Sequence, residues 1–419
     1  MSAGTAERRP MIVVDDGLGS FGPLCDLRPS YALRTGAVTT VERLQEEARG
    51  EVVGFRVPPR LAALVAEASR LPTNRLPDGD GFLFVNGRLL SLAALTAVPG
   101  DGDEGAVVRA DGTLIAAWLR RTTAILLMDT GRLPDGVPVA VSEAPLLATP
   151  WELLDRLGPL ITADVERIGG NADSLGYRVL PARDPARMGE HLVLIHRSAT
   201  IAPYVVFDTT AGPIHVGPKA VIRPFAVLCG PCSIGAGTTV SDRSLIKPNT
   251  ACGPQCRLGG EIGGTSIIGY SNKTHDGHLG DSILGEWVNL GAGTDNSNLL
   301  NTYGEVPIRL EPEGPRQRSG RIFLGSVIGD HVKCAIGTRL MTGTVIGTGA
   351  MIAGSTPPPS TVRRFAWITD GGERRFALGK FIEVMRAVMK RRSLEPGPAY
   401  LAEIEAVHRT SGDDDGAAS

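Results

Sequence analysis

The sequence predicts two different folds in one chain. An α/β domain is expected over residues 11–185, and an all-β, left-handed parallel β-helix built from hexapeptide repeats over residues 195–356, followed by a helical segment at 373–408. Strand-like apolar runs alternate with helix-like stretches in the first part, which is typical of α/β domains. A six-residue apolar period replaces them in the second part, and one apolar stripe at helical spacing follows.

The first part begins with elements of mixed type. Apolar runs at 11–14 and 82–85 end in glycine-containing loops, as buried strands do. Segments 41–49 and 60–70 are expected to be helices. A proline-rich stretch at 181–187 is expected to link this domain to the next.

The second part repeats every six residues. All eight positions of the first run are apolar, namely Val216, Ile222, Leu228, Ile234, Val240, Ile246, Cys252 and Leu258. At 42% hydrophobic residues, chance gives such a run about once in a thousand tries per register. A second run contains Ile322, Ile328, Cys334, Leu340, Ile346 and Ile352. This period predicts short strands on the three faces of a prism, with about 18 residues per coil.

The two runs are out of phase, and the pattern is interrupted at 270–278 and 295–321. Loops that leave a rigid scaffold often carry function, so candidate chemistry is expected at these interruptions. The first contains Lys273, His275 and His278. An imidazole can take a proton from an attacking amine near neutral pH.

Composition narrows the class of protein further. The net charge of -2 favours neither nucleic acid nor an anionic membrane as a partner. No apolar run approaches the roughly 18 residues that span a bilayer, and no apolar signal segment precedes the charges of residues 1–10. Six cysteines do not suggest a disulfide framework. A cytoplasmic protein is therefore expected. The stripe of the C-terminal helix, which includes Phe381 and Met385, is expected to pack on the β-helix and leave a basic edge in solvent.

Two stretches carry a family resemblance. The sequence SNKTHDGHLGD at 271–281 and the sequence VNLGAGT at 288–294 resemble the acetyltransferase domain of the bifunctional family that makes UDP-N-acetylglucosamine. The whole of 216–350, including NTYG at 301–304, resembles a divergent bacterial branch of that family more closely still. That family joins a glucosamine-1-phosphate acetyltransferase to an N-acetylglucosamine-1-phosphate uridylyltransferase. The resemblance implies a homotrimer that transfers an acetyl group from acetyl-CoA to an amino-sugar 1-phosphate.

The same resemblance implies roles for individual residues. His275 matches the catalytic base. Substrate contacts are implied for four residues, Lys247, Lys273, Asn289 and Asn298. Ala292 and Thr338 are implied to lie along the acetyl-CoA groove. Two positions depart from the family, which has a lysine near 264–265 and a tyrosine where this chain has Leu299.

The N-terminal domain has a weaker resemblance. The sequence VDDGLGS at 14–20 resembles the glycine-rich loop of sugar nucleotidyltransferases, which implies UTP phosphates bound near the backbone of Gly17 and Gly19. Arg28 and Arg34 are candidates to neutralise those phosphates. The family's arginine after the loop is Phe21 here, and its metal-binding aspartate is Arg88. A guanidinium does not bind Mg²⁺, so nucleotidyl transfer is expected to be weak or to have unusual metal needs.

Other functions remain open. Nucleotidyl transfer is a rival main activity, and a structural or regulatory trimer with two inactive sites is a rival of another class. The spacing of Cys229/Cys232 and of Cys252/Cys256 is like that of zinc ligands. Trimeric carbonic anhydrases share the β-helix fold and bind zinc with histidines, and this chain has four candidate histidines, namely His215, His275, His278 and His331. Cys252 occupies a core position and the sequence around these histidines is unlike those enzymes, so no metal site is expected.

Overall fold

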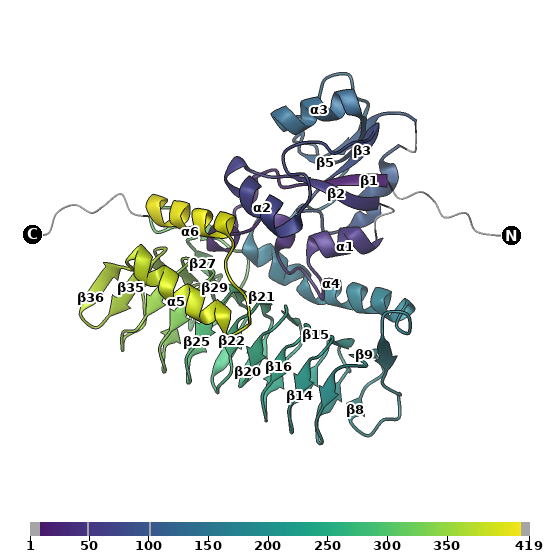
Figure 1. The fold of residues 1–419 in the computed structure, drawn as a ribbon. Coiled ribbons are helices and arrows are strands. Elements are labelled where there is room, and N and C mark those ends of the chain that lie inside the picture. The colour runs from purple at the N-terminus through teal and green to yellow at the C-terminus, as the bar shows by residue number, and fades with distance from the viewer. Residues whose placement is uncertain (1–8, 48–49, 100–101, 412–419) are drawn as a thin grey trace, which may run out of the picture.

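The computed structural model describes residues 9–47, 50–99 and 102–411. An α/β domain sits on one side of a long parallel β-helix, and two helices pack at the C-terminal end of the β-helix (Figure 1). The predicted fold class is thereby confirmed. No signal segment is expected from the sequence before the charges of residues 1–10, and residues 1–8 of that stretch lie outside the described part.

The N-terminal domain contains one mixed six-stranded sheet of order β2-β1-β3-β5-β4-β6. Its strands are β1 (Arg9–Val14), β2 (Gly50–Arg56), β3 (Gly81–Asn86), β4 (Gly105–Val108), β5 (Leu114–Arg120) and β6 (Val139–Val141). Its helices are α1 (Thr40–Glu47), α2 (Ala62–Ser69) and α3 (Arg121–Thr130). Strand side chains alternate between two cores, so Ile12 packs with Leu127 of α3 while Val13 packs with Leu64 of α2. Both expected helices are present, and residues 48–49 lie outside the described part.

Three sheets form the walls of the β-helix. Each is built from parallel strands one coil apart, and two of them end in an added antiparallel strand. The first, called the helix-covered sheet, contains β7 (Tyr177–Val179), β9 (Val193–His196), β12 (Ile214–Val216), β15 (Cys232–Ile234), β18 (Thr250–Cys252), β21 (Ser266–Gly269), β24 (Ile283–Glu286), β29 (Val327–Ile328), β32 (Val345–Ile346) and β34 (Thr361–Val362). The second, called the pocket sheet, contains β10 (Thr200–Ile201), β13 (Val221–Ile222), β16 (Thr239–Val240), β19 (Arg257–Leu258), β22 (Asn272–Lys273), β25 (Asn289–Leu290), β30 (Lys333–Cys334), β33 (Met351–Ile352), β35 (Ala366–Thr369) and β36 (Gly372–Arg375). The third sheet contains β8 (Arg187–Met188), β11 (Val206–Asp208), β14 (Val227–Cys229), β17 (Leu245–Ile246), β20 (Glu261–Gly263) and β23 (His278–Gly280), and β26 (Asp295–Asn296) pairs with β31 (Arg339–Leu340) beyond them.

The six-residue period marks the core of the prism. Every residue of the first run, from Val216 to Leu258, is completely buried, and the second run is buried from Ile328 to Ile352. Ile322 is the exception, because its side chain is 51% exposed. It precedes the strand that returns to the prism, so its place in the repeat is coincidental.

The two runs of the six-residue period are out of phase mainly because some coils are shorter than 18 residues and because one hairpin leaves the prism between them. Thr239 pairs with Arg257, eighteen residues on, but Arg257 pairs with Asn272, only fifteen residues on. The interruption at 270–278 therefore stays in the wall of the prism as β22, a corner and β23. Only the second interruption leaves the prism, as a hairpin of β27 (Pro307–Ile308) and β28 (Gln317–Arg318).

The C-terminal end differs from the prediction in two ways. Strands β34 and β35 continue the coils beyond residue 356 by pairing in parallel with β32 and β33. The helical segment consists of two helices, α5 (Leu378–Lys390) and α6 (Pro398–Thr410). The expected apolar stripe of α5 is buried, with Phe381, Met385 and Met389 at most 6% exposed.

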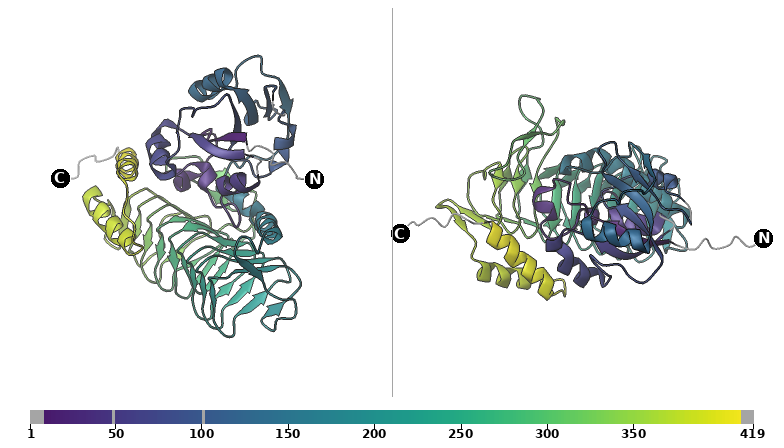
Figure 2. Two further views of the ribbon diagram at one scale, coloured as in Figure 1. Left: turned by 45° about the vertical axis from the view of Figure 1, so that its right-hand side comes forward. Right: turned by 90° about the horizontal axis from the view of Figure 1, so that it is seen from above.

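The N-terminal domain is held to the helix-covered sheet by α4 (Pro150–Gly170), which runs along that sheet (Figure 2). Outward side chains of the sheet, such as Ile283 and Val327, share one apolar core with Leu157 and Ile161 of α4. The short 3₁₀ helix Gly22–Cys25 belongs to the same junction, and other 3₁₀ helices lie at Ser30–Ala32, Pro59–Leu61 and Leu92–Ala97. Among the described residues, no helix combines the length and apolar character required to cross a membrane.

Candidate active site in the β-helix

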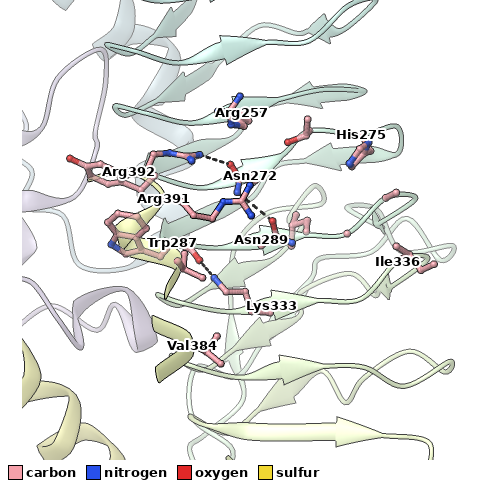
Figure 3. A pocket seen from close by; sticks show the side chains of 16 residues that line it. Arg257, Asn272, His275, Trp287, Asn289, Lys333, Ile336, Val384, Arg391 and Arg392 are labelled. Carbon is pink, nitrogen blue, oxygen red and sulfur yellow. Dashed lines mark hydrogen bonds between the residues drawn. The ribbon is translucent and has the colours of Figure 1, made fainter. Parts of the chain in front are cut away.

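A pocket of about 580 Å³ lies between the pocket sheet and α5 (Figure 3). We call it the α5 pocket; its lining consists of Arg257, Tyr270, Asn272, Thr274, His275, Trp287, Asn289, Leu290, Gly291, Ala292, Lys333, Ile336, Val384, Val388, Arg391 and Arg392. The volume is in the range of small-molecule sites. Three residues singled out from sequence, His275, Asn289 and Ala292, meet in this one pocket.

A column of polar side chains forms one wall of the pocket. Arg257, Asn272, Asn289 and Lys333 occupy equivalent positions on four consecutive strands of the pocket sheet. Neighbouring strands lie about 4.8 Å apart, so their side chains can contact each other. The Asn272 amide donates to Asn289 Oδ1 at 3.3 Å, and Arg392, just beyond the end of α5, donates to Asn272 Oδ1 at 3.1 Å. The column thus connects α5 to the wall of the prism (Figure 3).

His275 lies at the corner between β22 and β23, on the opposite side of the pocket from the α5 arginines (Figure 3). It is exposed, and within the described part of the chain no hydrogen bond to its ring is found. Its imidazole is therefore free to meet a substrate.

Lys273 does not line the pocket, and its implied role as a substrate contact must be corrected. It pairs in register with the core residue Leu258, points into the prism and is 1% exposed. Its ammonium donates to the backbone oxygens of His275 at 2.7 Å and Asp276 at 2.8 Å, and more weakly to that of Gly259 at 3.4 Å. Burial lowers the pKa of Lys273, with Asp295 and Asp276 opposing the shift. The side chain supports the corner that carries His275.

Three other residues implied by the resemblance lie outside the α5 pocket. Lys247, directly after β17 of the third sheet, pairs with Glu261 at 3.1 Å, and the Asn298 amide donates to Asp281 Oδ2 at 2.7 Å. Thr338 is 4% exposed and its hydroxyl donates to the Ala335 carbonyl at 2.8 Å, so it closes a turn instead of lining the groove. His278 is near Lys247, with Nδ1 3.2 Å from the Asn296 carbonyl and Nε2 3.9 Å from Glu261.

Sequence reasoning missed the basic residues of the pocket. Arg257 and Lys333 each directly precede a buried repeat position, so the six-residue register could have placed them on an outer face. Nothing in the sequence of α5 could have placed Arg391 and Arg392 there, because their location depends on how α5 packs. Burial lowers the pKa of Lys333 to about 8.

The glycine-rich loop of the N-terminal domain is present after β1, and Gly17 adopts a positive φ of 70°. Asp15 shapes the loop by accepting hydrogen bonds from the backbone N–H groups of Gly17 and Ser30. Arg88 forms a two-pronged ion pair with Asp16, with hydrogen bonds of 2.9 and 2.7 Å. A guanidinium thus occupies the place next to Asp16 where the resemblance leads one to expect a metal-binding carboxylate.

Arg28 and Arg34 are not available to nucleotide phosphates, which corrects the role considered for them. Both are buried between the domains, at 6% and 7% exposure. Arg28 donates to Asp330 at 2.8 Å and to Glu286 at 3.1 Å, both on the β-helix. Arg34 contacts the β-helix through its backbone oxygen, which accepts a hydrogen bond from Ser266. These arginines join the two domains.

Within the described residues, no cluster of three or more His, Cys, Asp or Glu side chains is arranged to hold a metal ion. Cys252 and Cys256 are buried in the prism. The ring of His215 is hydrogen-bonded to Ser233 and Tyr177, and burial lowers its pKa to about 4. These side chains are part of the packing of the protein.

Comparison with known proteins finds one matching family model and several curated relatives. Residues 11–172 match the family described as sugar nucleotidyl transferase. The chain is 32% identical over 136 residues to a bifunctional sugar-1-phosphate nucleotidylyltransferase/acetyltransferase of Sulfurisphaera tokodaii, covering 32% of this chain and 28% of that protein. It is 29% identical over 231 residues to the bifunctional protein GlmU of Burkholderia vietnamiensis, covering 49% of this chain and 45% of that protein. The matched stretches thus span less than half of these two relatives.

Among solved structures, the acetyltransferase domain of PglB from Neisseria gonorrhoeae in complex with acetyl coenzyme A is 16% identical, with 71% of this chain and 96% of that chain covered and a TM-score of 0.13. The family match at residues 11–172 covers the α/β domain and α4. Over parts of its length, the chain is thus similar to the sugar nucleotidyl transferase family and to bifunctional nucleotidylyltransferase/acetyltransferases.

Proposed function

We propose that this protein is a transferase of nucleotide-sugar biosynthesis, of the kind that leads to UDP-N-acetylglucosamine. Its β-helix domain transfers the acetyl group of acetyl-CoA to the amine of an amino-sugar 1-phosphate. The observation that carries this proposal is the α5 pocket, where an exposed imidazole, His275, lies with Asn289 and Ala292. The cytoplasm, where these small molecules are made, is the proposed location.

In the proposed reaction, His275 takes a proton from the sugar ammonium or from the amine as it attacks. The amine nitrogen forms a bond to the thioester carbon, the carbon–sulfur bond breaks, and the coenzyme A thiolate takes the proton from the His275 imidazolium and leaves as the thiol. Lys273 fixes the backbone of the corner that carries the base. The Asn289 side chain offers hydrogen bonds to bound substrate from the wall of the pocket.

The proposed assembly is a homotrimer, since closed symmetry is usual for homo-oligomers. Ile336, at the mouth of the α5 pocket, is 79% exposed in the single chain, which suits a position covered by a neighbouring copy. Light scattering should give the mass of three chains, and a monomer at micromolar concentration would contradict the proposal.

Nucleotidyl transfer from UTP to a sugar 1-phosphate is the second candidate, and the family match of residues 11–172 favours it. A structural trimer with two inactive sites is the third. One assay separates them: the protein is incubated with acetyl-CoA and glucosamine 1-phosphate, with and without UTP and Mg²⁺. Release of coenzyme A thiol supports acetyl transfer, and release of pyrophosphate supports nucleotidyl transfer. Absence of both would overturn the proposed enzyme.

A further inference from the structure

Three arginines gather at the α5 end of the pocket without acidic partners. Arg257 comes from the pocket sheet, and Arg391 and Arg392 directly follow α5 (Figure 3). Within the described part of the chain, none of the three forms an ion pair, and no Asp or Glu lines the pocket. Two basic residues within α5 do have acidic partners, since Lys380 pairs with Glu383 at 2.7 Å and Arg386 lies 3.9 Å from Glu395.

This cluster is electrostatically unfavourable without a ligand. Burial lowers the pKa of Arg392, and repulsion from Arg257 and Arg391 lowers it further. Lys333 adds a fourth cation to the same lining, and its ammonium donates to the Trp287 carbonyl. Like charges that converge on a pocket without counter-charge attract an anion, which offsets their repulsion on binding.

The neighbouring surface indicates what kind of anion fits. Beside the arginines, the lining includes Val384 and Val388 of α5 and the stacked rings of Tyr270 and Trp287, whose centroids are 4.5 Å apart. An inorganic anion would leave this apolar and aromatic surface uncovered. A nucleotide has phosphates for the guanidinium groups and a flat base for the apolar wall.

We propose that Arg257, Arg391 and Arg392 form a phosphate clamp for a nucleotide group, through which α5 makes the pocket selective for a nucleotide-bearing ligand. This inference rests on the proposed acetyl transfer. In that reaction the acetyl donor is acetyl-CoA, and its coenzyme A part carries an adenosine bisphosphate that supplies the nucleotide group. The clamp lies at the α5 side of the pocket and His275 at the opposite corner, so one elongated donor can reach both (Figure 3). A nucleotide sugar is the other source of the same chemistry.

Binding to the full-length protein tests the clamp without requiring turnover. Calorimetry with adenosine 3′,5′-bisphosphate, coenzyme A and UDP-N-acetylglucosamine compares the wild type with the double variant Arg391→Gln/Arg392→Gln. Lys390→Gln is the matched control, because Lys390 is the exposed last residue of α5 and does not line the pocket. The double variant should bind about 10- to 100-fold more weakly, as expected for the loss of charged hydrogen bonds, and the control should bind within about twofold of wild type.

The ligand whose binding depends on the arginines identifies the source of the nucleotide. Dependence for the bisphosphate and coenzyme A assigns the clamp to the acetyl donor, and dependence for UDP-N-acetylglucosamine alone assigns it to a nucleotide sugar. Equal affinities for wild type and the double variant, or no binding of any of the three, overturn the clamp. The clamp is also overturned if the double variant keeps its affinity for the ligands while light scattering shows a changed oligomeric state.

Kinetics separate failure of the clamp from failure of the proposed function. The double variant should lose the preference of the enzyme for acetyl-CoA over S-acetylpantetheine, which lacks the nucleotide. Acetyl transfer with an unchanged preference would leave the function standing and overturn the clamp. Arginine-dependent binding of the bisphosphate in a protein without acetyl transfer would leave the clamp standing and overturn the function.

Discussion

The Lys273 ammonium donates a hydrogen bond of 2.7 Å to the backbone carbonyl of His275, from inside the prism to the corner that faces the pocket. A charged residue thus occupies a core position of the β-helix, directly in register with Leu258.

Replacing Lys273 with methionine keeps the shape of the core but removes the support of the corner. We expect Lys273→Met to change the free energy of unfolding by about 1–3 kcal/mol, and to lower kcat for acetyl transfer by about tenfold or more because His275 is less well positioned. Leu258→Met is the matched control, because Leu258 is the core residue paired with Lys273, and this variant should keep the wild-type kcat. A wild-type kcat in Lys273→Met would refute the supporting role.

His275→Ala should remove most acetyl transfer and leave the melting temperature nearly unchanged. The side chain is exposed, so its loss leaves no cavity, whereas a positioned base contributes roughly 10²–10⁴-fold to the rate. Thioester cleavage with glucosamine 1-phosphate measures the effect. His278→Ala is the control, since His278 lies outside the α5 pocket. If His278→Ala abolishes turnover and His275→Ala does not, the base has been assigned to the wrong histidine.

Breaking the ion pair between Arg28 and Asp330 should weaken the contact between the domains. Arg28→Met leaves the completely buried Asp330 carboxylate without its cation, which typically costs about 3–5 kcal/mol. Chemical denaturation measures the loss. Adding Asp330→Asn removes the stranded charge and should recover part of the stability. If Arg28→Met alone is as stable as the wild type, the ion pair contributes nothing to stability.

The Asp330 carboxyl should also make the free energy of unfolding depend on pH. Burial raises the pKa of Asp330 from 3.8 to about 6, against the opposing charge of Arg28. Because the pKa is higher in the folded than in the unfolded state, the contribution of this group to stability is fully present below about pH 4 and is lost as pH rises through 6. Asp330→Asn should remove that component from the pH profile of the unfolding free energy. An unchanged profile would contradict it.

Mg²⁺-dependent release of pyrophosphate from UTP and a sugar 1-phosphate should be weak. Arg88 holds Asp16 with two hydrogen bonds, and its positive charge opposes a divalent cation at the same place. A pyrophosphate assay with Mg²⁺, with Mn²⁺ and without metal measures this, while acetyl transfer by the same preparation shows that the protein is folded. Robust turnover with Mg²⁺ would contradict the prediction.

Binding of adenosine 3′,5′-bisphosphate should weaken several-fold as pH rises from 7 to 9. Burial lowers the pKa of Lys333 to about 8, so this cation of the α5 pocket loses its charge within that range while the arginines keep theirs. Titrations at intervals of pH measure the effect. Lys333→Met should abolish the pH dependence, and the same slope in that variant would assign it to another group.

The sequence by itself determined the β-helix, because a six-residue period is local and each repeat position reports whether its side chain enters the prism. It also pointed to the corner that carries His275 through the motif of residues 271–281. The direction of Lys273 could have been obtained from the same register, since it follows Leu258 by one shortened coil. The motif resemblance instead made Lys273 a substrate contact, because a resemblance transfers roles without testing where a side chain points.

Only the tertiary structure decided what covers each outer face of the prism. Arg28 and Arg34 looked like phosphate ligands in sequence, yet the packing of the N-terminal domain on the helix-covered sheet buries them. Arg257 and Arg392 are more than a hundred residues apart, and they converge because α5 folds back over the pocket sheet. A local repeat defines which side of a strand faces outward, but the element that packs there is selected by long-range burial of apolar surface, which no short window of sequence contains.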